Sequence, residues 1–181
     1  MDGSDKGDGG AATAIHMKRA AQISRGQIEF PDEQQLESFA NKFAYEIRAP
    51  LVIWLEGDLG AGKTTFARAL IGALGYKGRV KSPTYGLLEQ YQMGLLQVLH
   101  MDLYRINDPA ELEFLGLADL LDEQTILLIE WPDKGGQWLP EPDFIFTFSY
   151  AVQGRDLHWI ACTEAAQALE LHENQRANRL H

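Results

Sequence analysis

The residues best suited to chemistry lie in one short segment, Gly57-x-x-x-x-Gly62-Lys63-Thr64. Glycine tolerates backbone angles that other residues avoid, so this segment can turn successive N–H groups toward one anion. The lysine adds a mobile positive charge for the β- and γ-oxygens of a nucleotide, and the threonine hydroxyl can bind Mg²⁺. The pattern therefore predicts a phosphate-binding P-loop. Its expected nucleotide-binding residues are Gly57, Asp58, Leu59, Gly60, Ala61, Gly62, Lys63, Thr64 and Thr65.

A P-loop needs a buried strand before it and a helix after it, and the sequence offers both. An apolar run leads into Gly57, and residues 63–74 have the pattern of a helix. A second apolar run, residues 125–130, is typical of a strand buried on both faces of a parallel sheet. It ends in Glu130, and a carboxylate at the tip of such a strand lies beside a P-loop and holds Mg²⁺, directly or through water. Thr64 and Glu130 are therefore the expected metal ligands.

The remaining elements are predicted from short-range patterns. Residues 31–33 open a helix whose apolar side chains recur every three to four positions and stop before Pro50. Asp108-Pro-Ala-Glu111 carries the residues of a helix start with a capping box. Alternating patterns predict strands at residues 27–30, 87–91, 95–101, 143–150 and 157–162, and residues 164–180 have the pattern of a terminal helix.

Length and composition bound the fold. With 181 residues, of which 45% are hydrophobic, the chain can fill one core. Strands that alternate with helices around a P-loop predict an α/β fold, a single P-loop NTPase domain with a mixed, partly parallel central sheet flanked by helices. Residues 1–16 hold almost nothing to bury, so we expect a disordered leader or an expression remnant there and the domain in residues 17–181.

Charge and cysteine content exclude several classes of protein. A formal net charge of −10 argues against direct binding to nucleic acid, which needs clustered Lys and Arg. Cys162 is the only cysteine, so no intramolecular disulfide can form, and we expect it to be a small core residue at the end of a strand. No apolar run approaches the ~20 residues of a membrane helix, and no signal peptide is recognisable. We therefore expect a cytoplasmic protein with no membrane partner.

Four separated blocks of the sequence together resemble one family. They are Gly57-Asp-Leu-Gly-Ala-Gly-Lys-Thr-Thr65, Lys81-Ser-Pro-Thr-Tyr85, His100-Met-Asp-Leu-Tyr-Arg105 with Asp108-Pro-Ala-Glu-Leu-Glu113, and Ile129-Glu-Trp-Pro132. In this order they are similar to the bacterial TsaE family, also called YjeE, across residues 31–160. The resemblance implies a small P-loop ATPase that uses ATP and Mg²⁺ and supports the synthesis of threonylcarbamoyladenosine in tRNA. It also implies binding to the TsaB–TsaD heterodimer, contact with tRNA only through that complex, and hydrolysis that resets the complex between turnovers.

The resemblance assigns roles to single residues as well. The magnesium ligands of the family correspond to Thr64 and Glu130, its essential aspartate to Asp102, and the tryptophan of its Glu-Trp-Pro motif to Trp131. Residues 81–85 resemble a switch loop near the γ-phosphate. Two further positions expected to lie close to the nucleotide are Glu33 and Arg155.

The expected catalytic residues are Lys63, Asp102 and Glu130. Because Trp131 follows Glu130, this strand lacks the second carboxylate with which many P-loop ATPases orient water. Asp102 is the candidate for that role since it ends a neighbouring strand, either by polarising water or by ordering a water bound to Mg²⁺. His100 shares the strand face of Asp102 and is better explained by a structural hydrogen bond than as a base. We expect slow hydrolysis by the isolated protein and faster hydrolysis with TsaB–TsaD.

Other functions of a P-loop fit the sequence less well. A small-molecule kinase would need a cationic lid, whereas the 16 Lys and Arg residues are scattered along the chain. A GTPase is disfavoured because Asn41-Lys42, the only Asn-Lys pair, precedes the P-loop and lacks the aspartate of a guanine-reading motif. The alternative that stays open is a nucleotide-dependent adaptor, in which ATP binding rather than hydrolysis regulates the partner complex.

Overall fold

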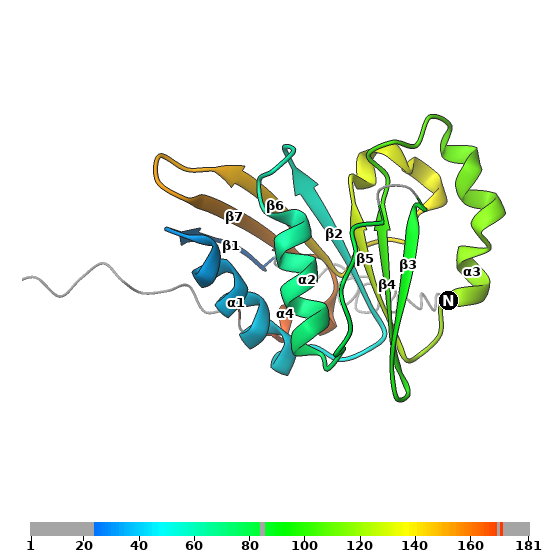
Figure 1. The fold of residues 1–181 in the computed structure, drawn as a ribbon, viewed down its shortest axis with the longest axis horizontal. Coiled ribbons are helices and arrows are strands. Elements are labelled where there is room, and N and C mark those ends of the chain that lie inside the picture. The colour runs from blue at the N-terminus through cyan, green and yellow to red at the C-terminus, as the bar shows by residue number, and fades with distance from the viewer. Residues whose placement is uncertain (1–23, 84–85, 170, 172–181) are drawn as a thin grey trace, which may run out of the picture.

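The structure is a computed structural model, and it describes residues 24–83, 86–169 and 171. These residues form a sheet of seven strands in the order β1-β7-β6-β2-β5-β4-β3 (Figure 1). The strands are β1 Ser24–Phe30, β2 Leu51–Gly57, β3 Leu88–Met93, β4 Leu96–Asp102, β5 Thr125–Glu130, β6 Phe144–Tyr150 and β7 Arg155–Ala161. The mixed α/β sheet expected from the sequence is confirmed, and each predicted strand is present.

The directions of the strands bring several strand ends to one edge of the sheet. β2 pairs in parallel with β5 and with β6, and β5 pairs in parallel with β4. Antiparallel strands complete both sides, β7 and β1 beyond β6 and β3 beyond β4. The carboxyl ends of β6, β2, β5 and β4 therefore meet at the same edge, which is where open α/β sheets bind their ligands.

Two helices cover one face of the sheet and fix the start of the P-loop helix. α1, Glu33–Glu46, follows Asp32, whose side chain accepts a hydrogen bond from the N–H of Gln35 at 2.9 Å. α2, Lys63–Ala73, packs beside α1 (Figure 1). Rings from both helices and from β6 interlock, with centroids 5.3 to 6.3 Å apart. The residues of this aromatic core are Phe39, Phe43, Phe66, Phe144, Phe146 and Phe148. Aromatic pairs of this kind contribute beyond their buried area, so they hold α2 firmly against the sheet.

Short helices cover the opposite face. They are η1 Pro109–Leu115, α3 Leu117–Leu120, η2 Pro132–Lys134 and η3 Gly136–Trp138. Side chains alternate along a strand, so Leu99 of β4 and Leu127 of β5 belong to the apolar cluster on this face. Val98 and Ile126 belong to the larger cluster under α1 and α2. Residues that share the phase of Val98 and Ile126 therefore point toward α2.

The helix start predicted at Asp108 is confirmed. Its carboxylate accepts from the N–H of Ala110 at 2.9 Å, and Glu111 accepts from the N–H of Asp108 at 3.1 Å, which completes a capping box. The segment that follows is a 3-10 helix, and Gly116, with a left-handed φ of 59°, separates it from α3.

Two expectations for the end of the chain fail within the described residues. The helix expected from residue 164 ends after a single turn, α4 Glu164–Gln167, and residues 168, 169 and 171 lie outside any helix. Leu169 and Leu171, which follow this turn, are partly buried against the apolar core without continuing the helix. Cys162 is exposed because it follows the inward-facing Ala161, and alternation turns it outward.

Several sequence expectations lie outside the described residues. They concern the leader expected in residues 1–16, positions 84–85 of the expected switch loop, and residues 170 and 172–181 of the expected terminal helix. Within the described part of the chain, no helix is long and apolar enough to cross a membrane.

Candidate nucleotide-binding site

The glycine-rich loop joins the end of β2 to the N-terminus of α2. Gly57 ends β2, and Gly62 is the N-cap of α2 with a φ of 123°, which side chains rarely tolerate. No side chain caps α2, so its first N–H groups can bind an anion, and the helix dipole adds positive potential there. A Cβ on Gly57 would lie 2.0 Å from the carbonyl oxygen of Phe148, so the entrance to the loop is packed directly on β6.

Lys63 is buried inside its own loop. Its side chain is 4% exposed, and Nζ donates to the carbonyl oxygens of Gly57 at 2.6 Å and of Asp58 at 2.7 Å. Burial lowers the pKa of Lys63, while the nearby carboxylates of Glu130 and Asp102 oppose that shift. The mobile charge expected from the sequence therefore has defined carbonyl partners in this state.

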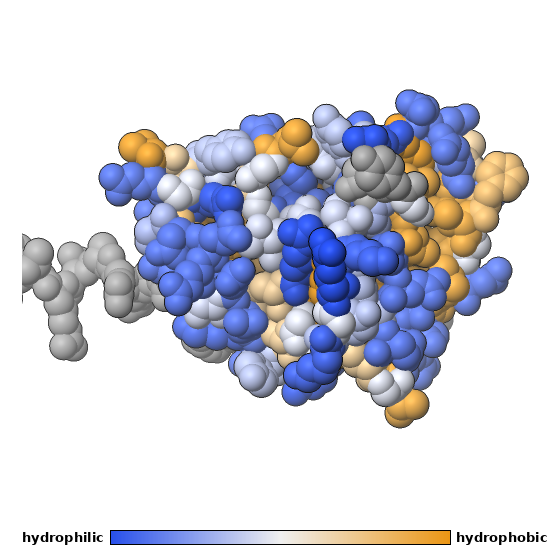
Figure 2. Space-filling view, viewed as in Figure 1, coloured by the Kyte–Doolittle hydropathy of each residue, from blue (hydrophilic) through white to orange (hydrophobic). Residues whose placement is uncertain are grey.

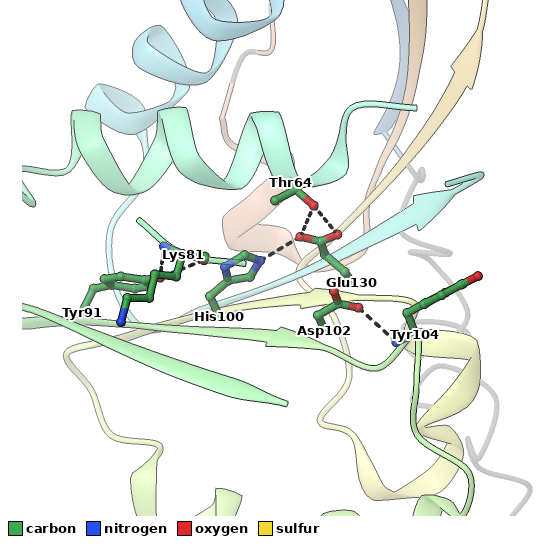
Figure 3. Close-up of polar contacts among 7 residues, drawn as sticks. All are labelled: Thr64, Lys81, Tyr91, His100, Asp102, Tyr104 and Glu130. Carbon is green, nitrogen blue, oxygen red and sulfur yellow. Dashed lines mark hydrogen bonds and ion pairs between the residues drawn. The ribbon is translucent and has the colours of Figure 1, made fainter. Parts of the chain in front are cut away.

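Two carboxylates reach the loop from neighbouring strands. The parallel register of β4 and β5 pairs Asp102 with Glu130, so both lie at the carboxyl edge of the sheet. Thr64 Oγ1 donates to Glu130, at 3.0 Å from Oε1 and 2.9 Å from Oε2 (Figure 3). Asp102 Oδ1 accepts the N–H of Tyr104 at 3.0 Å. The two expected metal ligands, Thr64 and Glu130, are thus in direct contact.

His100 completes the surroundings of Glu130. Its Nε2 lies 2.8 Å from Glu130 Oε1 and donates to this oxygen, because a carboxylate can only accept (Figure 3). The side chains of His100 and Glu130 are 0% and 3% exposed. The structural hydrogen bond expected for His100 is confirmed, and its acceptor is an expected metal ligand.

An aromatic pair lies over the buried lysine. The ring centroids of Trp131 and Tyr104 are 5.1 Å apart, and Lys63 Nζ is 4.2 Å from the Trp131 centroid. Lys134 Nζ lies 5.0 Å from the centroid of the Tyr104 ring and also donates a hydrogen bond to the Tyr104 carbonyl oxygen. Two cations therefore sit against one aromatic pair, an arrangement favoured by the ring quadrupoles.

A cavity of about 310 Å³ lies between the loop and the carboxylates. It brings together the expected residues Lys63, Thr64, Asp102 and Glu130. The other lining residues are Leu59, Gly60, Gly62, Thr65, Ser82, Tyr104, Arg105 and Trp131. Ser82 belongs to residues 81–85, which were expected near the γ-phosphate. Tyr104 and Arg105 were not assigned to the site from the sequence, although both lie in the same motif block as Asp102.

The expected residues Glu33 and Arg155 do not line this cavity. They pair with each other, with Arg155 Nη1 3.5 Å from Glu33 Oε2. A Cβ on Gly62 would lie 3.2 Å from Arg155 Cδ, so the pair borders the P-loop from outside the cavity. Of the loop itself, Gly57, Asp58 and Ala61 also lie outside the lining.

The donor set fits a metal ion bound together with a nucleotide. Among the described residues, no group of three or more His, Cys, Asp or Glu could hold a metal ion alone. Thr64 and Glu130 supply oxygen ligands, which Mg²⁺ prefers, but Mg²⁺ needs about six of them. A Mg²⁺ ion held by these two residues would need its remaining ligands from phosphate oxygens and water.

These features define the class of the protein. β2, the glycine-rich loop and α2 follow one another along the chain, and no side chain caps α2. β5 pairs in parallel with β2 and ends in a carboxylate, which is the arrangement of a P-loop NTPase domain. The fold class expected from the sequence is confirmed.

Comparison with known proteins identifies the family. Residues 30–157 match the family model described as "Threonylcarbamoyl adenosine biosynthesis protein TsaE", and the chain belongs to the TsaE family. It is 42% identical over 138 residues to a Haemophilus influenzae protein, covering 74% of this chain and 87% of that protein. It is 33% identical over 128 residues to a Borreliella burgdorferi protein, covering 70% and 92%. Both relatives are named tRNA threonylcarbamoyladenosine biosynthesis protein TsaE.

The fold also matches a solved relative. The crystal structure of Bacillus subtilis YdiB superposes with a TM-score of 0.68 at 26% identity, covering 81% of this chain and 92% of that one. The similarity therefore extends beyond the motif blocks to most of the domain.

Proposed function

We propose that this protein binds and hydrolyses ATP in a Mg²⁺-dependent reaction that serves the synthesis of threonylcarbamoyladenosine in tRNA. The observation that carries the proposal is the convergence of Lys63, Thr64 and Glu130 on one cavity at the N-terminus of α2. The pathway is supported by membership of the TsaE family, because the relatives from Haemophilus influenzae and Borreliella burgdorferi are named for it.

Each residue has a role that follows from its position. The N–H groups at the start of α2 bind phosphate, and Lys63 leaves the carbonyl oxygens of its own loop to bind the β- and γ-oxygens. Thr64 and Glu130 would hold Mg²⁺, and the ion would supply positive charge next to the phosphate groups. Asp102, one strand away in register with Glu130, orients the attacking water or a water bound to the metal.

Fast hydrolysis depends on a partner in this proposal. Trp131 occupies the position where a second carboxylate would follow Glu130, so the site depends on Asp102 and on the segment that contains Ser82. A partner that fixes these groups completes the site only in the complex. We propose that this partner is the TsaB–TsaD heterodimer. The net charge of −10 supports contact with tRNA through that complex rather than directly.

The test is an assay of phosphate release by the purified protein, with and without Mg²⁺ and with and without TsaB–TsaD. We expect slow release alone, a marked increase with the heterodimer, and no release from Lys63→Ala under either condition. Full activity without the heterodimer, unchanged on adding it, would contradict the partner-completed site.

The adaptor alternative makes a different prediction. If nucleotide binding alone regulates the partner, a non-hydrolysable ATP analogue should support multiple rounds of tRNA modification as well as ATP does. We expect instead that the analogue allows the complex to assemble but stops modification after the first round.

A further inference from the structure

One face of the sheet has a thin and incomplete cover. η1 and α3 are 7 and 4 residues long, and each buries only one leucine, Leu112 and Leu117, while Leu115 and Leu120 stay partly buried. Phe114 is 87% exposed, although it stands on the same short segment. Figure 2 shows an apolar area on the side of the molecule that carries α3 and β3. We call Phe114, Leu115, Leu120 and Leu121 the Phe114 patch.

The segment that carries this patch is rich in exposed acidic side chains. Residues 106–124 contain no Lys, Arg or His. All six carboxylates of this segment belong to exposed residues, namely Asp108, Glu111, Glu113, Asp119, Asp122 and Glu123. Asp108 and Glu111 also cap η1, but capping leaves their charge at the surface. The patch is therefore an apolar centre with a negative rim.

The chemistry of the rim decides what can cover the centre. An RNA or an anionic lipid surface would bring phosphate against six carboxylates, which is unfavourable. A second copy docked patch to patch about a two-fold axis would oppose one acidic rim with another. A protein surface with Lys and Arg around an apolar pocket would match both the centre and the rim.

We propose that the Phe114 patch is a docking surface for a protein that presents an apolar pocket bordered by Lys and Arg. Phe114 inserts into the pocket, since a projecting aromatic ring at the centre of a polar rim is typical of a residue that dominates binding. The rim aligns the partner and speeds its approach. The inference rests on the proposed function for its partner, the TsaB–TsaD heterodimer.

The test compares two exposed aromatic residues on different faces. Phe114→Ser should weaken binding of the full chain to purified TsaB–TsaD, in the presence of ATP and Mg²⁺, at least tenfold. The matched control is Tyr45→Ser on α1, where the ring is 75% exposed, and it should bind like the wild type. Both variants should keep the affinity for ATP of the isolated protein, because neither residue lines the nucleotide cavity.

Charge reversal tests the rim separately. Glu113→Lys should weaken binding to the heterodimer and reduce its sensitivity to added salt, whereas Glu37→Lys on α1, the same charge change at an exposed site, should do neither. Equal affinity of Phe114→Ser and wild type for the heterodimer would overturn the docking surface and leave the proposed function intact. Absence of binding by the wild type would overturn the proposed partner and the docking surface together. A wild-type dimer that Phe114→Ser converts to a monomer would identify a second copy as the occupant and overturn the inference.

Discussion

Replacing Gly57 by alanine tests whether the contact between the P-loop and β6 holds the nucleotide site in place. The chain offers a matched control, since Gly57 and Gly75 have the same φ of 116°. A Cβ at position 57 would lie 2.0 Å from the carbonyl oxygen of Phe148, whereas a Cβ at position 75 has nothing within 4 Å. The pair therefore separates backbone strain from a steric clash.

The expected magnitudes follow from these two terms. A side chain in such a backbone conformation costs about 1–3 kcal/mol, and this cost applies at both positions. Overpacking against fixed atoms adds about 1–3 kcal/mol, and this cost applies only at position 57. Gly75→Ala should thus lower the free energy of unfolding by about 1–3 kcal/mol and Gly57→Ala by roughly 2–6 kcal/mol. Because Gly57 pairs with Phe148, relief of the clash must move the loop away from β6.

Urea unfolding of both variants measures the free energy of unfolding. Titration with a fluorescent ATP analogue measures the affinity of the nucleotide site. We expect Gly75→Ala to bind the analogue as the wild type does and Gly57→Ala to lose most of its affinity at a urea concentration of zero, where both are folded. Equal losses of stability in the two variants, or unchanged affinity in Gly57→Ala, would refute the idea that β6 positions the loop.

The other predictions concern the groups around the cavity. Lys63→Ala should abolish productive ATP binding in calorimetry while thermal unfolding shows an intact fold, and unchanged affinity would remove the basis for the nucleotide site. Glu130→Gln should raise the Mg²⁺ concentration needed for binding more than it weakens nucleotide binding itself, whereas identical Mg²⁺ titrations would make Glu130 structural. His100→Leu should weaken the apparent Mg²⁺ affinity about 10–100-fold, as loss of a partner of a metal ligand does, and His100→Gln, which keeps a donor, should restore most of it. Asp102→Ala should retain ATP and partner binding but lose stimulated hydrolysis and multiple-turnover tRNA modification, so a variant active in a reconstituted assay would exclude the proposed role.

Much of the fold could be predicted because its signals are local. The apolar runs before Gly57 and up to Glu130 indicate buried strands by composition alone, and the cap at Asp108 follows from four neighbouring residues. The order of the strands could not be predicted in this way. β2 pairs with both β5 and β6, which lie about 70 to 90 positions further along the chain, and no short sequence pattern encodes such a pairing. The exposure of Cys162 likewise depends on which face of β7 the rest of the fold covers, because Cys162 lies on the opposite side from the buried Ala161.

The candidate site could be predicted where a residue stands at the end of an element. Glu130 and Asp102 end parallel strands, so their meeting at one edge follows from the sequence once those strands are neighbours. The hydrogen bond from His100 to Glu130 needs the relative register of β4 and β5, which only the structure supplies. The same is true of Tyr104, which lines the cavity and whose ring packs against Trp131.

The resting contacts of Lys63 have a consequence for how long a product stays bound. A lysine that returns to two carbonyl oxygens of its own loop is not left as an unpaired buried charge when a nucleotide departs. The two hydrogen bonds must be broken when a nucleotide binds, which lowers the affinity for every nucleotide by a similar amount. They form again when the nucleotide leaves, which shortens the time for which it stays bound. ADP lacks a γ-phosphate that could bind Lys63, so it gains less binding energy than ATP when it displaces the lysine from the carbonyl oxygens. Occupancy of the loop should therefore follow the ratio of ATP to ADP around it.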